Sequence, residues 1–424
     1  MRSLYTLLLY LATPLLLVYL FLRGLRSKDY LKRWPERFGW FEPPDPPGGI
    51  AVHAVSMGEV NAASMLVQEL IRRFPDDPLC LTTLTPTGSA RVRELFGDAV
   101  FHVYIPLDLP GAVRRFLDRV RPRLLVIMET EIWPNLYHQA AARGIPILIV
   151  NARISEHSFG AYRRLRRLTG AVLRKTSGIG AQSALDRQRL LEVGARDGQI
   201  TVTGNMKFDV RVPPSLTEQG EALRLAWGTQ RRVLVAGSTH EGDERALLAA
   251  FNRLLVTFPD ALLVLVPRHP ERFARAAQLA RQSGLTVSLR SAGISCPVGT
   301  QCFVVDAMGE LLRYYAAADV AFVGGSLEPI GGHNVLEPAA LSKPVLFGPH
   351  TANFADITRQ LLESEAAFRV ADAEQLEAAV RRLFSAPDLR DRMGRAGLEL
   401  VKSGQGAVAR TLEMIERQLT ARAD

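Results

Sequence analysis

Cysteine, aromatic residues and metal-binding patterns are all scarce in this chain of 424 residues. The three cysteines form no CxxC pair and no Cys/His cluster with zinc spacing, which indicates free thiols in a reducing compartment. No Asp-x-Asp sequence occurs, which argues against a divalent metal holding a nucleotide phosphate. We therefore expect no metal and no cofactor. The 47% of hydrophobic residues and the length predict a globular α/β protein of two domains.

The charge balance is strongly basic, with a formal net charge of +9 and a pI of about 9.7. Such a balance allows nucleic acid, an anionic membrane or an acidic substrate as partner. No nucleic-acid-binding motif with interleaved aromatic residues occurs, so we expect no nucleic acid. Two arginine-rich stretches, 114–123 and 163–175, are either solvated helix faces or contacts for anionic head groups.

The N-terminal segment, residues 1–33, has the composition of a membrane anchor. Leu4–Leu22 carries no charge and, at about 1.5 Å per residue, just crosses a hydrocarbon core of roughly 30 Å. Basic residues follow it closely, which predicts that the bulk of the chain lies on the cytoplasmic side of a membrane. A cleaved signal peptide is the rival, but no small-x-small site precedes the basic residues. A helix kinked at Pro14 and lying in one leaflet remains the alternative to a spanning helix.

Residues 34–209 alternate between short apolar runs and helical patterns, which predicts a parallel sheet covered on both faces. The ligands of such sheets gather at the carboxyl ends of the strands. Expected strands in this domain are Gly49–Val55, Leu79–Thr83, Val100–Ile105, Leu124–Met128, Ile145–Val150 and Ile200–Val202.

Acidic and basic residues follow several of these runs. Glu59 comes where the first run gives way to a helix, and there it either takes a proton from an acceptor hydroxyl or is a carboxylate stabilised by the dipole at the helix N-terminus. Glu129 and Glu131 follow the fourth run, and two carboxylates so close at a strand end are difficult to explain by packing. Lys207 follows the last run, as a fixed positive charge or an ordinary surface lysine. Together these residues suggest a cleft.

A polar, proline-bearing stretch, 210–220, is the expected linker, and a second Rossmann-like domain is expected over 221–424. Its expected strands are Arg232–Ala236, Ala261–Val266, Cys302–Val305, Val320–Val323 and Val345–Phe347.

Val320–Ala340 is the stretch around which this domain is organised. Gly324, Gly325, Gly331 and Gly332 allow the backbone to approach a ligand closely. A helix is expected to open near Asn334, its free N–H groups facing a phosphate, with Glu337 in reach of a ribose diol. An ordinary glycine-rich turn with Glu337 in a helix cap is the alternative.

Two other strand ends of this domain bring further candidates to the same rim. Arg268 follows Pro267 and offers a guanidinium that grips phosphate bidentately. Gly309 opens the backbone beside Met308, so main-chain groups there are placed to hydrogen-bond a base edge.

Six spaced motifs resemble those of the Kdo (3-deoxy-D-manno-octulosonic acid) transferases, which build the inner core of lipopolysaccharide on lipid A. The resemblance covers nearly the whole chain, since the N-terminal anchor and six motifs occur in the right order. The six motifs are His53–Val60, Met128–Asn135, Gly204–Asp209, Pro267–Phe273, Asp306–Leu311 and Gly331–Ala339.

The resemblance implies a GT-B fold, with two Rossmann-like domains facing a cleft. It also implies transfer of Kdo from CMP-Kdo to a lipid A precursor (lipid IVA), without a metal, at the cytoplasmic face of a bacterial inner membrane. It implies inversion at the anomeric carbon, with Glu59 as the general base and Glu129 and Lys207 as stabilisers of the transition state. The CMP-binding residues that it implies are Pro267, Arg268, Met308, Gly309, Glu310, Asn334, Val335, Leu336 and Glu337.

Two other functions remain open. The first is another membrane-associated GT-B transferase that uses a UDP-sugar, and competition by CMP or UDP separates it from a Kdo transferase. The second is a degenerate transferase that serves as a membrane scaffold, which predicts losses at Glu59, Arg268 or Glu337, although all three are present. The number of Kdo residues added does not follow from the sequence.

Overall fold

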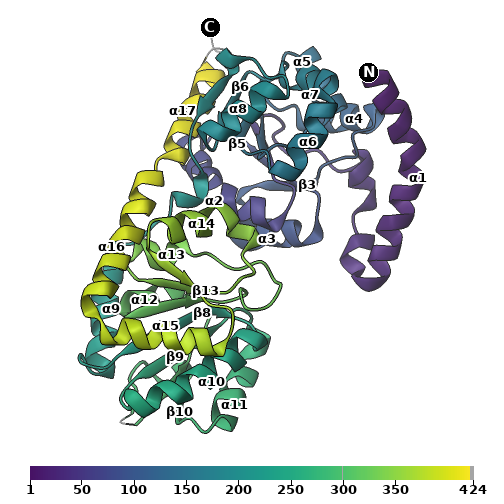
Figure 1. Ribbon diagram of the computed structural model, residues 1–424. Helices are drawn as coiled ribbons and strands as arrows, with labels where there is room; N and C mark the ends of the chain where they lie inside the picture. Colours follow the sequence, from purple (N-terminus) through teal and green to yellow (C-terminus); the bar gives the residue numbers. More distant parts are fainter. Residues whose placement is uncertain (298, 421–424) are drawn as a thin grey trace. The chain divides into compact units, whose positions relative to one another are not determined.

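The computed structural model describes residues 1–297 and 299–420, and the chain forms two compact units. The first unit contains residues 1–209 together with the segment from Gln405, and the second contains Val210–Gly404. Each unit is built around its own parallel seven-stranded sheet with helices on its faces, as Figure 1 shows. The fold is therefore α/β, with the two Rossmann-like domains of the GT-B type.

The sheet of the first unit has the strand order β3-β2-β1-β4-β5-β6-β7. All of its neighbouring pairs are parallel; for example, Ile50 of β1 lies opposite Leu79 of β2 and Leu124 of β4. The inner strands are continuous apolar runs because helices cover both faces of the sheet. The strands are β1 (Ile50–His53), β2 (Leu79–Thr83), β3 (Phe101–Tyr104), β4 (Leu124–Met128), β5 (Ile147–Ala152), β6 (Gly178–Ala181) and β7 (Ile200–Val202).

The helices of the first unit begin mostly at side-chain caps or at proline. Ser56, for example, accepts a hydrogen bond from the Glu59 N–H at the start of α2. The α-helices are α1 (Arg2–Arg26), α2 (Met57–Arg73), α3 (Pro86–Phe96), α4 (Pro110–Val120), α5 (Pro134–Ala142), α6 (Glu156–Arg164), α7 (Arg166–Leu173), α8 (Ala184–Glu192) and α17 (Ala407–Thr420). Short 3-10 helices are η1 (Lys28–Leu31), η2 (Trp34–Phe38), η3 (Gly97–Ala99), η4 (Asp197–Gln199) and η5 (Met206–Phe208).

The sheet of the second unit has the order β10-β11-β9-β8-β12-β13-β14. Its central strand β8 pairs in parallel with β9 and β12. The strands are β8 (Val233–Thr239), β9 (Leu262–Pro267), β10 (Val287–Leu289), β11 (Cys302–Val304), β12 (Val320–Val323), β13 (Val345–Phe347) and β14 (Ala367–Arg369). The helices are α9 (Ser215–Trp227), α10 (Glu241–Thr257), α11 (Phe273–Gln282), α12 (Leu311–Ala317), α13 (Leu336–Ala340), α14 (Ala355–Glu363), α15 (Ala373–Ser385), α16 (Pro387–Gly404), η6 (Pro270–Arg272), η7 (Arg290–Ala292) and η8 (Ala352–Phe354).

Eleven expected strands are present, and β6, β10 and β14 are additional. β6 has the sequence GIGA, whose glycines hide its apolar pattern. A Cβ at Gly178 would lie 3.0 Å from Leu148 and 3.2 Å from Met414, so this strand needs glycine to fit beneath α17. β10 and β14 have three residues each and lie at the two edges of their sheet, where short strands carry little pattern.

The domain boundaries differ from the sequence expectation at two places. Helix α9 begins at Ser215, so only residues 210–214 of the expected linker 210–220 precede it. The segment from Gln405 belongs to the first unit rather than to the second domain expected over 221–424. Asp209 accounts for the return, because its carboxylate accepts hydrogen bonds from the N–H groups of Gly406 (2.6 Å) and Val408 (2.7 Å) at the start of α17.

The length and composition of helix α1 allow it to cross a membrane, although a signal sequence can have the same length and apolar composition. Most of its apolar side chains are exposed. One side of the helix nevertheless touches the first unit, where Leu9 and Leu16 pack against Leu107 and Leu109. The Thr6 hydroxyl donates to the Asn135 side chain at 3.1 Å, at the start of α5. Thus α1 is a mainly exposed apolar helix fixed along one stripe.

Candidate active site

Glu59 lies in the first turn of α2, just after β1, and its side chain is almost wholly buried. Its carboxylate accepts a hydrogen bond from the Val55 N–H at 2.8 Å and one from the Ser56 hydroxyl at 3.2 Å. Burial raises the pKa of Glu59 to about 8, although these two hydrogen bonds by themselves lower that pKa. Glu59 therefore takes part in the N-terminal cap of α2. It is also a buried carboxyl group whose pKa suits proton transfer near neutral pH.

Glu129 and Glu131 lie near Glu59, because both carboxylates add to the rise of its pKa. Glu129 ends β4 with a left-handed backbone at φ +55°. A glutamate rarely adopts this conformation, and such strain gathers at functional sites. The Glu131 side chain accepts a hydrogen bond from the Trp133 indole at 3.1 Å. The structure thus brings three acidic residues of the predicted site together in the first unit.

Lys207 lies in η5, which packs against α2 and therefore near the helix that carries Glu59. Its backbone N–H donates to the Asn205 side chain at 3.0 Å. The preceding residue, Met206, donates its N–H to the Asn151 side chain, also at 3.0 Å. Asn151 is fully buried, has φ +54°, and its amide nitrogen has no partner among the described residues. Asn151 thus links the end of β5 to the turn that carries Lys207.

Arg268 follows β9 in the second unit, and its N–H donates to the Thr239 carbonyl at 3.1 Å, which fixes the backbone at the end of β8. Its positive charge lowers the pKa of Glu337, although burial prevails and raises that pKa to about 7. No carboxylate of residues 1–297 or 299–420 lies within salt-bridge distance of the guanidinium. Arg268 and Glu337 are therefore neighbours, with the guanidinium available to an anion.

The segment Asn334–Glu337 turns into α13 as expected, but this helix has only five residues. The Asn334 side chain accepts a hydrogen bond from the Leu336 N–H and donates one to the Glu337 carboxylate, both at 3.1 Å. Val335 and Leu336 are buried, so only their backbone groups are placed to meet a ligand. Because α13 is so short, its dipole contributes little to binding an anion.

Met308 and Gly309 lie in the exposed turn before α12, where Gly309 has φ +80°. Glu310 follows, but its carboxylate pairs with Arg290 at 3.0 Å and also with Arg313. The Tyr314 hydroxyl donates to the same carboxylate at 3.0 Å. This turn therefore offers backbone groups to a ligand, while the Glu310 side chain is occupied within the protein.

Three histidines of the second unit, His240, His269 and His333, form a cluster that the sequence analysis did not identify. The Nε2 atoms of His240 and His333 lie 3.0 Å apart, and their rings are stacked. His269 lies edge-on to His240. Burial and the Arg268 charge lower the pKa of His333 to about 3, so this imidazole is neutral at physiological pH. His333 therefore adds a neutral hydrogen-bonding group near Arg268.

The described residues contain no group of three or more histidine, cysteine, aspartate or glutamate side chains arranged to hold a metal ion. The three cysteines are free thiols, of which Cys80 and Cys302 are buried. The predicted residues thus form two sets, each within one unit. Glu59, Glu129 and Lys207 belong to the first, and the residues from Pro267 to Glu337 belong to the second.

Comparison with known proteins gives the same family over the whole chain. The family model described as "3-Deoxy-D-manno-octulosonic-acid transferase (kdotransferase)" matches residues 32–210. A 3-deoxy-D-manno-octulosonic acid transferase of Haemophilus influenzae is 40% identical over 99% of this chain and 99% of its own length. The transferase of the same description from Bordetella pertussis is 38% identical over 98% of this chain and 99% of its own length.

Solved structures agree on the fold. A UDP-GlcNAc 2-epimerase from Neisseria meningitidis aligns with a TM-score of 0.55 over 87% of this chain and 100% of its own, at 14% identity. Identity this low shows a shared fold alone. The two full-length relatives carry the stronger finding, and the chain belongs to the Kdo transferase family of glycosyltransferases.

Proposed function

We propose that this protein transfers Kdo from CMP-Kdo to a hydroxyl group of a lipid A precursor such as lipid IVA, in lipopolysaccharide core biosynthesis. The observation that carries the proposal is the environment of Glu59, a buried carboxyl group with a pKa of about 8 beside two further glutamates. It is supported by Arg268, which lies near Glu337 at the strand ends of the second unit and has no salt bridge to a carboxylate among the described residues. Two relatives that align over nearly the whole chain are named as Kdo transferases, and their names support Kdo as the transferred sugar.

In the proposed reaction, the acceptor hydroxyl oxygen forms a bond to the anomeric carbon of Kdo. The bond from that carbon to the phosphate oxygen breaks, and its electron pair leaves with CMP as a phosphate monoester. Attack from the face opposite the leaving group inverts the anomeric centre. The hydroxyl proton passes to the Glu59 carboxylate, a type of base catalysis that contributes about 10²–10⁴-fold.

The other residues of the site take roles that fit their surroundings. Arg268 and nearby backbone N–H groups neutralise the charge that develops on the phosphate oxygen, so a metal ion is not needed. The backbone around Met308 and Gly309 contacts the base, and Asn334 and Glu337 contact the ribose. Lys207 and Glu129 stabilise the transition state, with Lys207 supplying positive charge near the Kdo carboxylate.

We also propose that α1 lies in one leaflet at the cytoplasmic face of the inner membrane. Thr6, near the start of the helix, bonds Asn135, and η1 and η2, which follow the helix, belong to the same unit. A helix that crossed the bilayer would separate its first turns from that unit. The remaining surface of α1 is apolar and exposed, which suits the acyl region of a leaflet.

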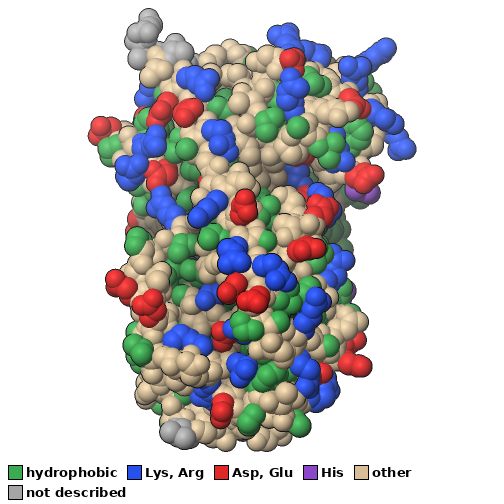
Figure 2. Space-filling model, turned by 60° about the vertical axis from the view of Figure 1, so that its left-hand side comes forward, with side chains coloured by type: hydrophobic (Ala, Val, Ile, Leu, Met, Phe, Trp, Pro, Cys, Tyr) green, Lys and Arg blue, Asp and Glu red, His purple; other side chains and the backbone are tan. Residues whose placement is uncertain are grey.

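We propose no nucleic-acid partner despite the basic pI, because the sequence contains no nucleic-acid-binding motif with interleaved aromatic residues. On the face drawn in Figure 2, basic side chains are interspersed with acidic ones over much of the surface. A nucleic-acid-binding surface needs a continuous basic stripe to follow the phosphates.

A transfer assay tests the proposed function. Purified protein is incubated with CMP-Kdo and lipid IVA, and mass spectrometry then gives the mass and the number of Kdo residues added. We expect addition of at least one Kdo without added metal and in the presence of EDTA, inhibition by CMP, and no inhibition by UDP. Glu59→Gln is the matched variant, since it keeps the shape of the side chain but cannot take the proton. Inhibition by UDP alone, or full transfer by Glu59→Gln, would contradict the proposal.

A further inference from the structure

The loop between β12 and α13, residues 324–335, ends in the histidine and asparagine that face Arg268 and Glu337. Its backbone is unusual, because Gly325, Gly331 and Gly332 all have positive φ. The Gly332 N–H donates to the Gly325 carbonyl at 2.8 Å and closes the loop on itself. Backbone N–H groups that are buried in such a loop need hydrogen-bond acceptors, and a side chain outside the loop can supply them.

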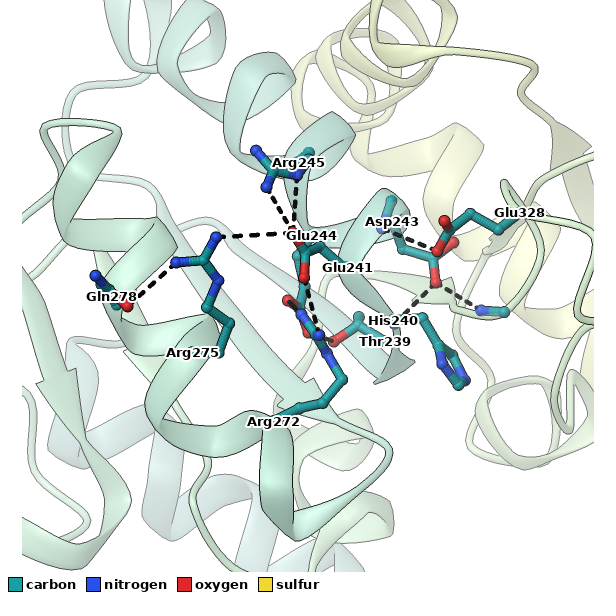
Figure 3. A network of polar contacts seen from close by, with 12 residues as sticks. Thr239, His240, Glu241, Asp243, Glu244, Arg245, Arg272, Arg275, Gln278 and Glu328 are labelled. Carbon is teal, nitrogen blue, oxygen red and sulfur yellow. Dashed lines mark hydrogen bonds and ion pairs between the residues drawn. The ribbon is translucent and has the colours of Figure 1, made fainter. Parts of the chain in front are cut away.

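Asp243, in the first turn of α10, is that side chain. It is fully buried, and its Oδ2 accepts hydrogen bonds from the Gly325 N–H at 2.7 Å and the His240 N–H at 3.0 Å. Its Oδ1 accepts a third hydrogen bond, from the Leu327 N–H at 3.1 Å. Figure 3 shows Asp243 pointing from α10 toward this loop. One carboxylate therefore binds both the start of α10 and the start of the loop.

A second carboxylate makes the reverse connection. Glu328, in the loop, accepts a hydrogen bond from the Gly242 N–H of α10 at 2.9 Å, and it lies beside Asp243 in Figure 3. A Cβ at Gly242 would lie only 2.4 Å from the Glu328 carboxyl carbon, so the contact requires glycine on the helix. Loop and helix thus each supply an acceptor to the other.

The contacts between the loop and α10 extend to His240 and His333. A Cβ at Gly325 would lie 2.8 Å from the His333 ring, so that ring packs directly on the backbone that Asp243 holds. His333 also contacts His240, and the backbone N–H of His240 donates to Asp243. A shift of Gly325 must therefore move His333 and the neighbouring Asn334.

We propose that Asp243 is a positioning residue for donor binding, because it holds the loop 324–335 in the conformation that presents His333 and Asn334 to the CMP part of the donor. This inference rests on the proposed function, which places the donor at this loop. Asp243 itself does not touch the donor; it acts through the Gly325 and Leu327 backbone.

The geometry specifies a carboxylate rather than an amide at position 243. Each of the two oxygens accepts at least one backbone N–H. An asparagine in either orientation would direct its NH₂ group at a backbone N–H, and that buried donor would lose its partner. The substitution Asp243→Asn therefore changes the hydrogen bonding while leaving the side-chain volume almost unchanged.

The experiment measures CMP affinity by isothermal titration calorimetry and amide hydrogen exchange by mass spectrometry in wild type and Asp243→Asn. We expect the Kd for CMP to rise by about tenfold, and exchange in the peptide that contains Gly325–Leu327 to become faster by a similar factor. In the transfer assay the KM for CMP-Kdo should rise, whereas the KM for lipid IVA should not change.

Two further variants separate positioning from a general loss of structure. Glu241→Gln removes a negative charge from the same turn of α10, but Glu241 pairs with Arg245 and Arg272 and has no bond to the loop. We expect its CMP affinity and loop exchange to stay within twofold of wild type. Glu328→Ala removes the hydrogen bond from the Gly242 N–H to the partly exposed Glu328 carboxylate, and it should raise the Kd for CMP about threefold. This variant tests the proposal independently if Asp243→Asn does not fold.

The outcomes distinguish the two levels of inference. A wild-type protein that does not bind CMP contradicts the proposed function. A wild-type protein that binds CMP, together with Asp243→Asn or Glu328→Ala variants that bind it equally well without faster loop exchange, overturns the role of Asp243. Equal weakening in Glu241→Gln and Asp243→Asn would show that charge at this turn, not the loop connection, controls affinity.

Discussion

Asn151 accepts a hydrogen bond from the Met206 N–H at 3.0 Å, across 55 residues of sequence. This bond connects the carboxyl end of β5 to the 3-10 turn that carries Lys207. Asn151 makes the bond from a left-handed backbone at φ +54°, a conformation that asparagine tolerates better than most residues. Two properties of one residue, its φ and its amide oxygen, are therefore needed to place the predicted lysine.

Two substitutions at Asn151 separate these properties. Asn151→Ala loses both the acceptor and the tolerance of positive φ, and should lower the free energy of unfolding by about 2–4 kcal/mol. Asn151→Gly keeps the tolerance and loses only the acceptor, so about half of that loss is expected. Urea unfolding measures both variants. Equal stability of the two would show that backbone strain at this position is negligible.

Glu59 should give transfer a strong pH dependence. Its carboxylate form is needed to take the proton, and its pKa is raised to about 8. We therefore expect kcat/KM to rise with pH and to level off above about pH 8. In Glu59→Gln the low residual activity should be independent of pH in this range. A rate that falls between pH 6 and 8 would contradict the role of Glu59 as base.

The same shift predicts the pH dependence of stability. Burial raises the folded-state pKa of Glu59 above its ordinary value of 4.5, so the folded protein binds more protons than the unfolded chain between pH 4.5 and about 8. The contribution of Glu59 to the free energy of unfolding therefore falls as the pH rises from 4.5 to about 8 and Glu59 becomes ionised in the folded protein. Glu59→Gln should gain about 1–3 kcal/mol over wild type between pH 5 and 9 in urea unfolding. A constant difference would show that the carboxyl is not desolvated.

Arg268→Ala should weaken CMP binding by about tenfold or more, because a charge-assisted hydrogen bond to phosphate is lost. Titration calorimetry with CMP measures this loss, and cytidine provides the control. Since cytidine has no phosphate, its weaker binding should be unchanged in the variant. Equal losses for CMP and cytidine would show that Arg268 supports the fold of the site rather than the phosphate.

Helix α1 should mediate binding to lipid vesicles through its exposed side. Leu11 and Leu15 are 66% and 74% exposed, so changing both to glutamate should release the protein from anionic vesicles without loss of stability. Leu225→Glu is the matched control, since Leu225 is 73% exposed on α9 in the second unit. Sedimentation with vesicles measures the bound fraction. Retention of the double variant would contradict membrane docking through this side of α1.

The sequence was sufficient to predict the α/β class, because continuous apolar runs such as Leu124–Met128 alternate with helical patterns. It was also sufficient to predict that Glu59, Glu129 and Lys207 lie at strand ends. It did not predict β6, whose glycines are required by the fit beneath α17 and therefore depend on a segment more than 200 residues away. It also gave no sign of Asp243, because the backbone groups that this residue binds lie in a loop more than 80 residues further along the chain.

The left-handed conformation of Glu129 could not be predicted for a related reason. Its N–H donates to the Val150 carbonyl of the neighbouring strand at 2.9 Å, so tertiary pairing overrides the preference of glutamate for other conformations. The occupation of the Glu310 carboxylate by Arg290 likewise depends on a residue outside the motif that singled it out. Local patterns therefore predicted the candidate residues, whereas contacts distant in sequence determine the surroundings of their side chains.

The return of α17 to the first unit also affects the order in which the chain can fold. Residues 210–404 are continuous, so every residue of the second unit is translated before α17 is made. The first unit lacks Val408, Leu412 and Ile415 of its hydrophobic core until then. The half that carries Glu59 is thus translated first and completed last, and its uncovered sheet is the surface that a chaperone would have reason to protect during synthesis.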